Sequence, residues 1–214
     1  MDGIDAKVLT LPILGAVADL CPLPDPAEVT YWQNRGARIF TIDYELDDNY
    51  TAMDLQRAIL QINYDDMNMP ESELKPIVIQ LHSFGGDSYQ AYALADTILT
   101  SRTPVITVAA SVAMSAGFII LIAGHKRYAF PHAQALVHAG YAAFEGTASE
   151  VEQAQKNYKR MQTVDKKFVL ERTAIPEAVY NRQKNKDWYL SVDDMLKYKI
   201  IDGVVEKVTD VFKI

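Results

Sequence analysis

The 214-residue sequence contains a single cysteine, Cys21, so no disulfide can form within the chain. One thiol cannot build a cysteine-rich zinc site, and the four histidines, separated by 43, 7 and 6 positions, lack the spacing of a helical metal site. We therefore expect no metal and no cofactor, and a reducing compartment, the cytoplasm, as the location. A chain of this length can bury roughly 70% of its unfolded surface, so it folds without such crosslinks.

Basic residues are fewer than acidic ones. The chain has 21 lysines and arginines and 28 aspartates and glutamates, which gives a net charge of −7. This balance works against binding to a nucleic-acid backbone. The sequence has neither a G-x-x-x-x-G-K-[ST] phosphate loop nor a strand followed by G-x-G-x-x-G, which removes the support for nucleotide binding. The first twenty residues lack a basic region followed by an apolar core, so we expect no signal peptide.

The longest uncharged run, residues 103–124, has 22 residues and matches the thickness of a bilayer. Its composition divides it into two parts. Residues 105–108 are β-branched and predict a buried strand, whereas residues 115–123 predict a short buried helix, with small residues between them. We favour this strand and helix over a membrane span, and we expect no membrane association.

The order of predicted elements indicates one α/β domain. The proline-rich residues 1–28 predict an irregular arm, and residues 29–214 predict a single domain. Predicted strands cover residues 38–42, 76–81, 105–108, 135–137 and 204–205, and predicted helices begin near residues 51, 87, 115, 149 and 191. Strands that alternate with helices favour a mainly parallel, curved or layered sheet.

A long helix is predicted after Ser149, which we interpret as its cap. One face of this helix carries an apolar stripe: Val151, Ala154, Tyr158, Met161, Val164 and Phe168. Such a stripe packs either in the core of the chain or against another subunit.

Nucleophilic catalysis is the chemistry that the remaining motifs favour. Ser115 lies where the buried strand changes into a helix, and its small neighbours would let a substrate carbonyl approach. Free backbone N–H groups at a helix N-terminus, and at the turn formed by Gly85 and Gly86, could stabilise an oxyanion. His138, at the end of another strand, would be the base, and its imidazole needs an acid to fix the tautomer.

These same segments resemble the Clp protease proteolytic subunit family, ClpP. Residues 81–87, LHSFGGD, resemble the family's I-N-S-P-G-G segment, and residues 113–118, AMSAGF, resemble its nucleophile helix in order and spacing. Residues 136–138, LVH, resemble its M-I-H, and residues 187–191, DWYLS, resemble its D-x-F-x-S-A segment. The resemblance covers roughly residues 38–206.

The resemblance implies a Ser-His-Asp triad of Ser115, His138 and Asp187, separated by 23 and 49 residues. Ser111 is the rival nucleophile, but the register of the resemblance places it where the family has glycine. The resemblance further implies an oxyanion hole from the backbone N–H groups of Gly86 and Ala116, with Gly85 contributing to substrate binding.

The implied fold is the ClpP/crotonase-like layered sheet of repeated β-β-α or β-α units with a protruding long helix. The implied activity is serine endopeptidase action on peptides and unfolded proteins, inside a homo-oligomer of stacked heptameric rings that relies on an AAA+ ATPase unfoldase for folded substrates. Phe84, Ala116 and the Ala139-Gly140 pair depart from the family's pattern and favour a divergent, prophage-type member.

Three alternatives remain open at this point. A crotonase-type acyl-CoA enzyme shares the fold and the paired backbone donors, but it usually employs a carboxylate base. An inactive ring subunit would assemble without turnover. A membrane-anchored signal-peptide peptidase is the third.

Overall fold

The computed structural model describes residues 26–47, 51–140 and 142–212, which divide into two compact units between Ala37 and Arg38. The described part of the first unit contains helix α2, Pro26–Gly36. Of the arm expected over residues 1–28, residues 1–25 lie outside the described residues, and residues 26–28 begin α2. The proposed domain limits of 1–28 and 29–214 stay a prediction.

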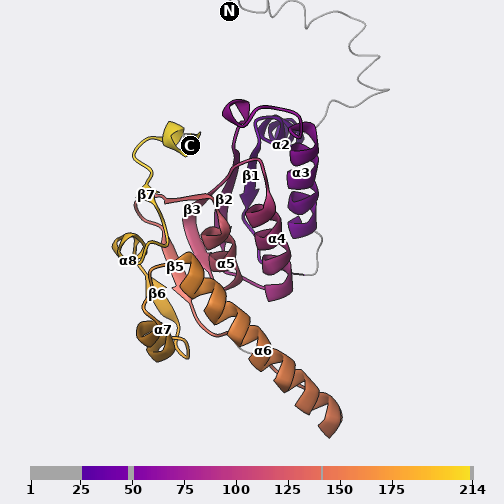
Figure 1. Ribbon diagram of the computed structural model, residues 1–214, viewed down its shortest axis with the longest axis vertical. Coiled ribbons are helices and arrows are strands. Elements are labelled where there is room, and N and C mark those ends of the chain that lie inside the picture. Colours follow the sequence, from indigo (N-terminus) through magenta and orange to yellow (C-terminus); the bar gives the residue numbers. More distant parts are fainter. Residues whose placement is uncertain (1–25, 48–50, 141, 213–214) are drawn as a thin grey trace, which may run out of the picture. The chain divides into compact units, whose positions relative to one another are not determined.

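The second unit alternates strands and helices (Figure 1). In chain order its elements are β1 Ile39–Ile42, α3 Thr51–Asp65, η2 Glu71–Glu73, β2 Ile77–Ser83, α4 Ser88–Thr100, β3 Val105–Met114, α5 Ala116–Ala123, β4 Lys126–Ala129, β5 Gln134–Val137, α6 Ala148–Arg172, α7 Glu177–Gln183, β6 Trp188–Leu190, α8 Val192–Lys197, β7 Gly203–Val204 and η3 Val208–Phe212.

The strands form one sheet in the order β1-β2-β3-β4-β7, with every neighbouring pair on this path parallel. Strand β3 is long enough to have two partners on the same side. Its first half pairs with β4, and its last three residues pair with β5, which in turn pairs antiparallel with β6. The sheet therefore splits near the middle of β3, and this confirms the mainly parallel, layered sheet expected from the sequence.

Two apolar clusters cover the two faces of the central strands. Alternate side chains of β3 point to opposite faces, so Val105 joins the larger cluster while Ile106 joins the smaller one. Helices α3, α4 and α5 pack on the face with the larger cluster (Figure 1). All eight residues of α5 are buried, which explains why this helix is apolar on every side.

The uncharged run over residues 103–124 is β3 followed by α5, so the predicted strand and helix are both present. The strand does not end at residue 108, however. It continues through the small residues to Met114, because these residues pair with β2 and β5. Within the described ranges, no helix has both the length and the apolarity needed to cross a bilayer.

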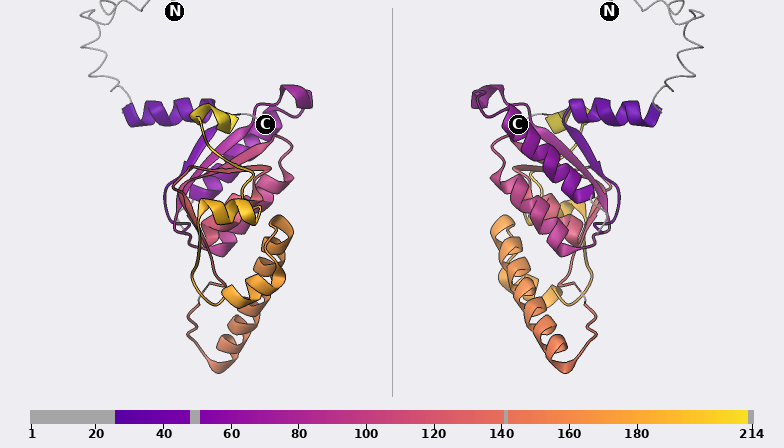
Figure 2. Two further views of the ribbon diagram at one scale, coloured as in Figure 1. Left: turned by 90° about the vertical axis from the view of Figure 1, so that its left-hand side faces the viewer. Right: turned by 90° about the vertical axis from the view of Figure 1, so that its right-hand side faces the viewer.

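Helix α6 extends away from the sheet in both side views of Figure 2. Ser149 is not its cap. Thr147 occupies that position, because its hydroxyl accepts from the Glu150 backbone N–H while the Glu150 carboxylate accepts from the Thr147 N–H. This reciprocal pair satisfies two free N–H groups, which a cap at Ser149 would not do.

The buried carboxylate of Asp66 ties three segments of the second unit together. Arg38 donates to both of its oxygens, at 2.6 and 2.7 Å, and the hydroxyl of Thr103 donates to one of them at 2.8 Å. The hydrogen bonds from Arg38 hold the pKa of Asp66 below its usual value of 3.8. Its ionised form is therefore favoured by folding.

We expect Asp66→Asn to lower the free energy of unfolding by about 3 kcal/mol at neutral pH, because it leaves Arg38 without its ionic partner. The sign of the pH dependence follows from the lowered pKa. The stabilisation is complete above the unfolded pKa of about 3.9 and is lost as the pH falls through the folded value. Urea unfolding at several pH values measures this effect, and the exposed Asp54, paired with Arg57, provides the control Asp54→Asn with a change below about 0.5 kcal/mol.

Candidate active site

Ser115 lies at a sharp turn between the end of β3 and the start of α5. Its backbone has φ 52° and ψ −118°, a region that non-glycine residues rarely adopt. Such a conformation costs about 1–3 kcal/mol and persists only where the surroundings impose it. Here the Ser115 N–H donates to the Leu136 carbonyl of β5 at 3.0 Å, and its own carbonyl accepts from Phe118 N–H at 3.0 Å. The turn presents the hydroxyl outside the helix, as in a nucleophile elbow.

The pairing of β5 with β6 brings His138 and Asp187 together. Val137 is opposite Trp188 in this antiparallel pair, so the residue after β5 faces the residue before β6. The His138 Nδ1 atom lies 3.1 Å from Asp187 Oδ1, and its Nε2 atom lies 2.7 Å from Ser115 Oγ. The three side chains thus form a continuous hydrogen-bonded chain, although they come from distant parts of the sequence.

This geometry suits one imidazole tautomer. With the proton on Nδ1, His138 donates to Asp187, and its Nε2 lone pair accepts from the Ser115 hydroxyl. The side chain of His138 is 17% exposed, whereas that of Asp187 is 62% exposed. The base is thus largely shielded within this chain, while the acid is open to solvent or to a neighbouring subunit.

The two glycines of the first motif place backbone beside Ser115. Gly85 has φ 118°, and a Cβ added to it would lie 2.7 Å from the Ser115 Cβ. Gly86 has φ 127°, and an added Cβ would meet the Leu46 backbone. Both positions require glycine because of their positive φ as well as the lack of space.

Gly86 and Ala116 both line the cavity that contains Ser115 and His138. Ala116 is the first residue of α5, where a backbone N–H has no carbonyl one turn earlier to bond within the helix. Gly85 lies against the Ser115 turn. The structure therefore brings all six residues singled out from the sequence into one region.

Asp165, Asp193 and Asp194 are other acids that could be considered for orienting the imidazole, but the carboxylate hydrogen-bonded to His138 is that of Asp187. The Asp165 carboxylate accepts a hydrogen bond from Tyr92 at 2.8 Å, and Asp194 forms the capping box of α8 with Ser191. Asp193 lies in the first turn of the same helix, where a carboxylate suits the positive end of the dipole. The rival nucleophile Ser111 is an exposed residue within β3.

The described part of the chain contains no cluster of three or more His, Cys, Asp or Glu side chains that could hold a metal. His125 has a structural partner instead, because its Nδ1 accepts from the Val105 N–H at 2.9 Å. Burial lowers the pKa of His125.

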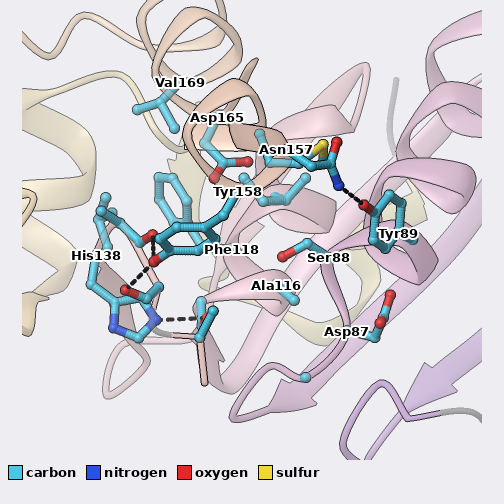
Figure 3. A pocket seen from close by; sticks show the side chains of 18 of the residues that line it. Asp87, Ser88, Tyr89, Ala116, Phe118, His138, Asn157, Tyr158, Asp165 and Val169 are labelled. Atoms are coloured by element: carbon cyan, nitrogen blue, oxygen red, sulfur yellow. Dashed lines mark hydrogen bonds between the residues drawn. The ribbon is translucent and has the colours of Figure 1, made fainter. Parts of the chain in front are cut away.

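Helices α4 and α6 also contribute to the cavity walls, which was not predicted from the sequence. Asn157 donates to the Tyr89 hydroxyl at 2.8 Å, and the Tyr158 hydroxyl donates to the Gly140 carbonyl at 2.8 Å (Figure 3). The apolar stripe on α6 was the signal that could have indicated this role, because Ala154, Tyr158 and Met161 all line the cavity.

Comparisons with known proteins agree on one family. The Clp protease family matches residues 37–208 of the chain. An ATP-dependent Clp protease proteolytic subunit of Deinococcus radiodurans is 28% identical over 151 residues, which is 70% of this chain and 72% of that protein. A proteolytic subunit of Porphyromonas gingivalis is 28% identical over 172 residues, 79% of this chain and 74% of that protein.

Among solved structures, a ClpP1 mutant from Listeria monocytogenes has a similar fold, with a TM-score of 0.72 and 22% identity over 86% of this chain and 99% of that one. The similarity at this identity establishes the fold. The family match confirms the resemblance seen in the motifs and favours the peptidase over the acyl-CoA enzyme. The chain belongs to the Clp protease family and is a serine-type endopeptidase.

Proposed function

We propose that Ser115, His138 and Asp187 are the catalytic triad of a peptidase that works inside an oligomeric chamber. The observation that carries the proposal is the hydrogen-bonded chain from Ser115 Oγ through His138 to Asp187, at 2.7 and 3.1 Å. It is supported by the backbone conformation of Ser115, which lines the cavity together with His138.

The Ser115 oxygen attacks the carbonyl carbon of a peptide bond while His138 takes the hydroxyl proton. Asp187 stabilises the resulting imidazolium and keeps its orientation. As the C–N bond breaks, His138 gives the proton to the leaving amine, and an acyl-enzyme remains on Ser115. Water then attacks this ester, with His138 acting again as base and then as acid, and Ser115 is restored.

The backbone N–H groups of Gly86 and Ala116 are the proposed oxyanion hole. Both residues line the cavity beside the nucleophile, and neither donor depends on a side chain that must be held in place. Removing one such donor typically reduces the rate by about 10²- to 10³-fold. Gly85 permits the close approach of this backbone to Ser115 and to a bound substrate.

The proposed assembly is a homo-oligomer of stacked heptameric rings. Within α6, every residue of which is described, only Val169 is fully buried, so most of the apolar stripe retains exposed surface. Members of the stripe differ in how far the chain itself covers them. Phe168 packs on Tyr92 in the same chain, at 5.6 Å between ring centroids, whereas Val164 is 40% exposed. Such a half-covered helix is suited to packing against another subunit.

Substrates of the assembly would be peptides and unfolded proteins. The sequence has no phosphate loop, so the chain cannot itself couple ATP hydrolysis to unfolding. A separate AAA+ ATPase unfoldase is therefore the proposed partner for folded substrates. A cytoplasmic location is also proposed, and the single cysteine supports it.

We expect the purified protein to sediment as a high-mass ring assembly that cleaves short peptides without ATP and leaves a stable folded protein intact. The physical reason is that an enclosed chamber admits extended chains and excludes folded domains. Sedimentation and peptidase assays on one sample measure both properties. A monomer that digests folded proteins unaided would contradict the chamber, and a ring without peptidase activity would favour an inactive subunit.

A further inference from the structure

The cavity beside Ser115 continues into a recess that α6 closes. The whole cavity has a volume of about 420 Å³. Figure 3 shows Asp165 and Val169 projecting from α6 on one side, with Phe118 and Ala116 on α5 on the other. Because the residue that supplies the attacked carbonyl lies next to the nucleophile, its side chain is the one that would enter this recess.

Two carboxylates, Asp87 and Asp165, line the cavity. Asp87 is the cap of α4 and accepts from the Gln90 N–H at 2.9 Å, whereas Asp165 lies among side chains that are largely apolar and aromatic. The nearby lining side chains include Phe118, Met161, Val169 and Tyr180. Asp165 itself is half-buried and accepts one hydrogen bond, from the Tyr92 hydroxyl at 2.8 Å. An ionised side chain does not stabilise the apolar walls of a recess, so Asp165 is a candidate for a role in binding substrate.

The charge of Asp165 lacks a cation to balance it. In the described parts of the second unit, no lysine, arginine or histidine forms a salt bridge with this carboxylate. Burial raises the pKa of Asp165, and the pKa of Tyr92 is raised above its usual range by burial and by the Asp165 charge. A half-buried carboxylate of this kind gains free energy when a cation reaches it.

We propose that Asp165 makes the recess a binding site for a cationic side chain, lysine or arginine, on the substrate residue immediately N-terminal to the cleaved bond. The apolar walls contact the methylene stem, while the carboxylate binds the charged end. A leucine in the same place would bury the Asp165 carboxylate without a cationic partner. The free-energy cost of that burial would make leucine substrates bind more weakly than lysine or arginine substrates. The inference rests on the proposed catalytic role of Ser115, and it makes Asp165 a specificity residue rather than a catalytic one.

The test compares kcat/KM for two short peptides that differ only in lysine or leucine before the cleaved bond. We expect the wild-type protein to prefer lysine by at least 10-fold. In Asp165→Asn, which keeps the size of the side chain and its bond to Tyr92, the lysine-to-leucine ratio should fall by about 30-fold or more. The matched control is Glu171→Gln, which removes one charge from an exposed position on the same helix and should change the ratio by less than twofold.

A second variant separates recognition from a structural role of Asp165. Tyr92→Phe removes the hydrogen bond and keeps the carboxylate, so the lysine preference should persist. If Asp165 serves only to hold Tyr92, Tyr92→Phe will change the ratio as much as Asp165→Asn does. That result would overturn the inference, as would a wild-type preference for leucine.

A binding measurement keeps this test independent of catalysis. Fluorescence anisotropy on the Ser115→Ala variant compares labelled peptides that end in lysine or in leucine. Tighter binding of the lysine peptide, abolished by adding Asp165→Asn, supports the recess even if the nucleophile has been assigned wrongly. Equal binding of the two peptides would reject the recess while leaving the triad unaffected.

Discussion

Replacing Ser115 with alanine should abolish peptide hydrolysis, with a loss of rate on the order of 10⁴-fold or more. The hydroxyl is the proposed nucleophile, and no other group of the triad can form the acyl-enzyme. The loss should fall on kcat, because the cavity and its backbone donors are unchanged. Peptidase assays on the variant measure the effect, and sedimentation checks that the assembly is retained.

The matched control for this variant is Ser111→Ala, which removes a hydroxyl from an exposed position on the same strand, four residues earlier. Its activity should stay within about twofold of the wild-type value, since surface substitutions away from a site change little. If Ser111→Ala is inactive while Ser115→Ala still cleaves peptides, the nucleophile has been assigned to the wrong serine.

Asp187→Asn should reduce kcat on the order of 10⁴-fold while the ring still assembles. An amide in place of the carboxylate can donate to Nδ1 of His138, which puts the ring proton on Nε2. His138 could then no longer accept the Ser115 proton. Measurement of kcat for a short peptide, together with sedimentation, separates this chemical loss from a failure to assemble.

Asp193→Asn provides the control, because this exposed acid lies at the start of α8 and should retain full activity. Asp165→Asn is informative as well, since its expected effect is on the choice of substrate. Full activity of the Asp187 variant, or loss confined to one of the other acids, would reassign the orienting residue.

The main strands and the nucleophile turn were predictable because their signals are local. Residues 105–108 are β-branched and residues 116–123 are apolar on every side, so a buried strand followed by a buried helix was expected and is confirmed, although the strand extends to Met114. The order and spacing of the motifs are sufficient to indicate the family, and the family match confirms it. The roles of individual residues in the triad stay predictions.

The features that the sequence did not reveal depend on pairing between distant segments. Strand β6 has only three residues, and its place beside β5 follows from tertiary contacts rather than from any local pattern. Without that pairing, the proximity of His138 and Asp187 could only be inferred from the resemblance. The cap of α6 was misplaced by two residues, because Ser149 and Thr147 are both favourable caps and the Glu150 partner decides between them.

Covalent labelling tests the central claim most directly. The protein is treated with a serine-directed phosphonate, its intact mass is measured, and the modified residue is located by peptide mapping. We expect one adduct per chain, on Ser115, that is absent from the Ser115→Ala variant. An adduct on another serine, or an active peptidase that takes up no phosphonate, would contradict it.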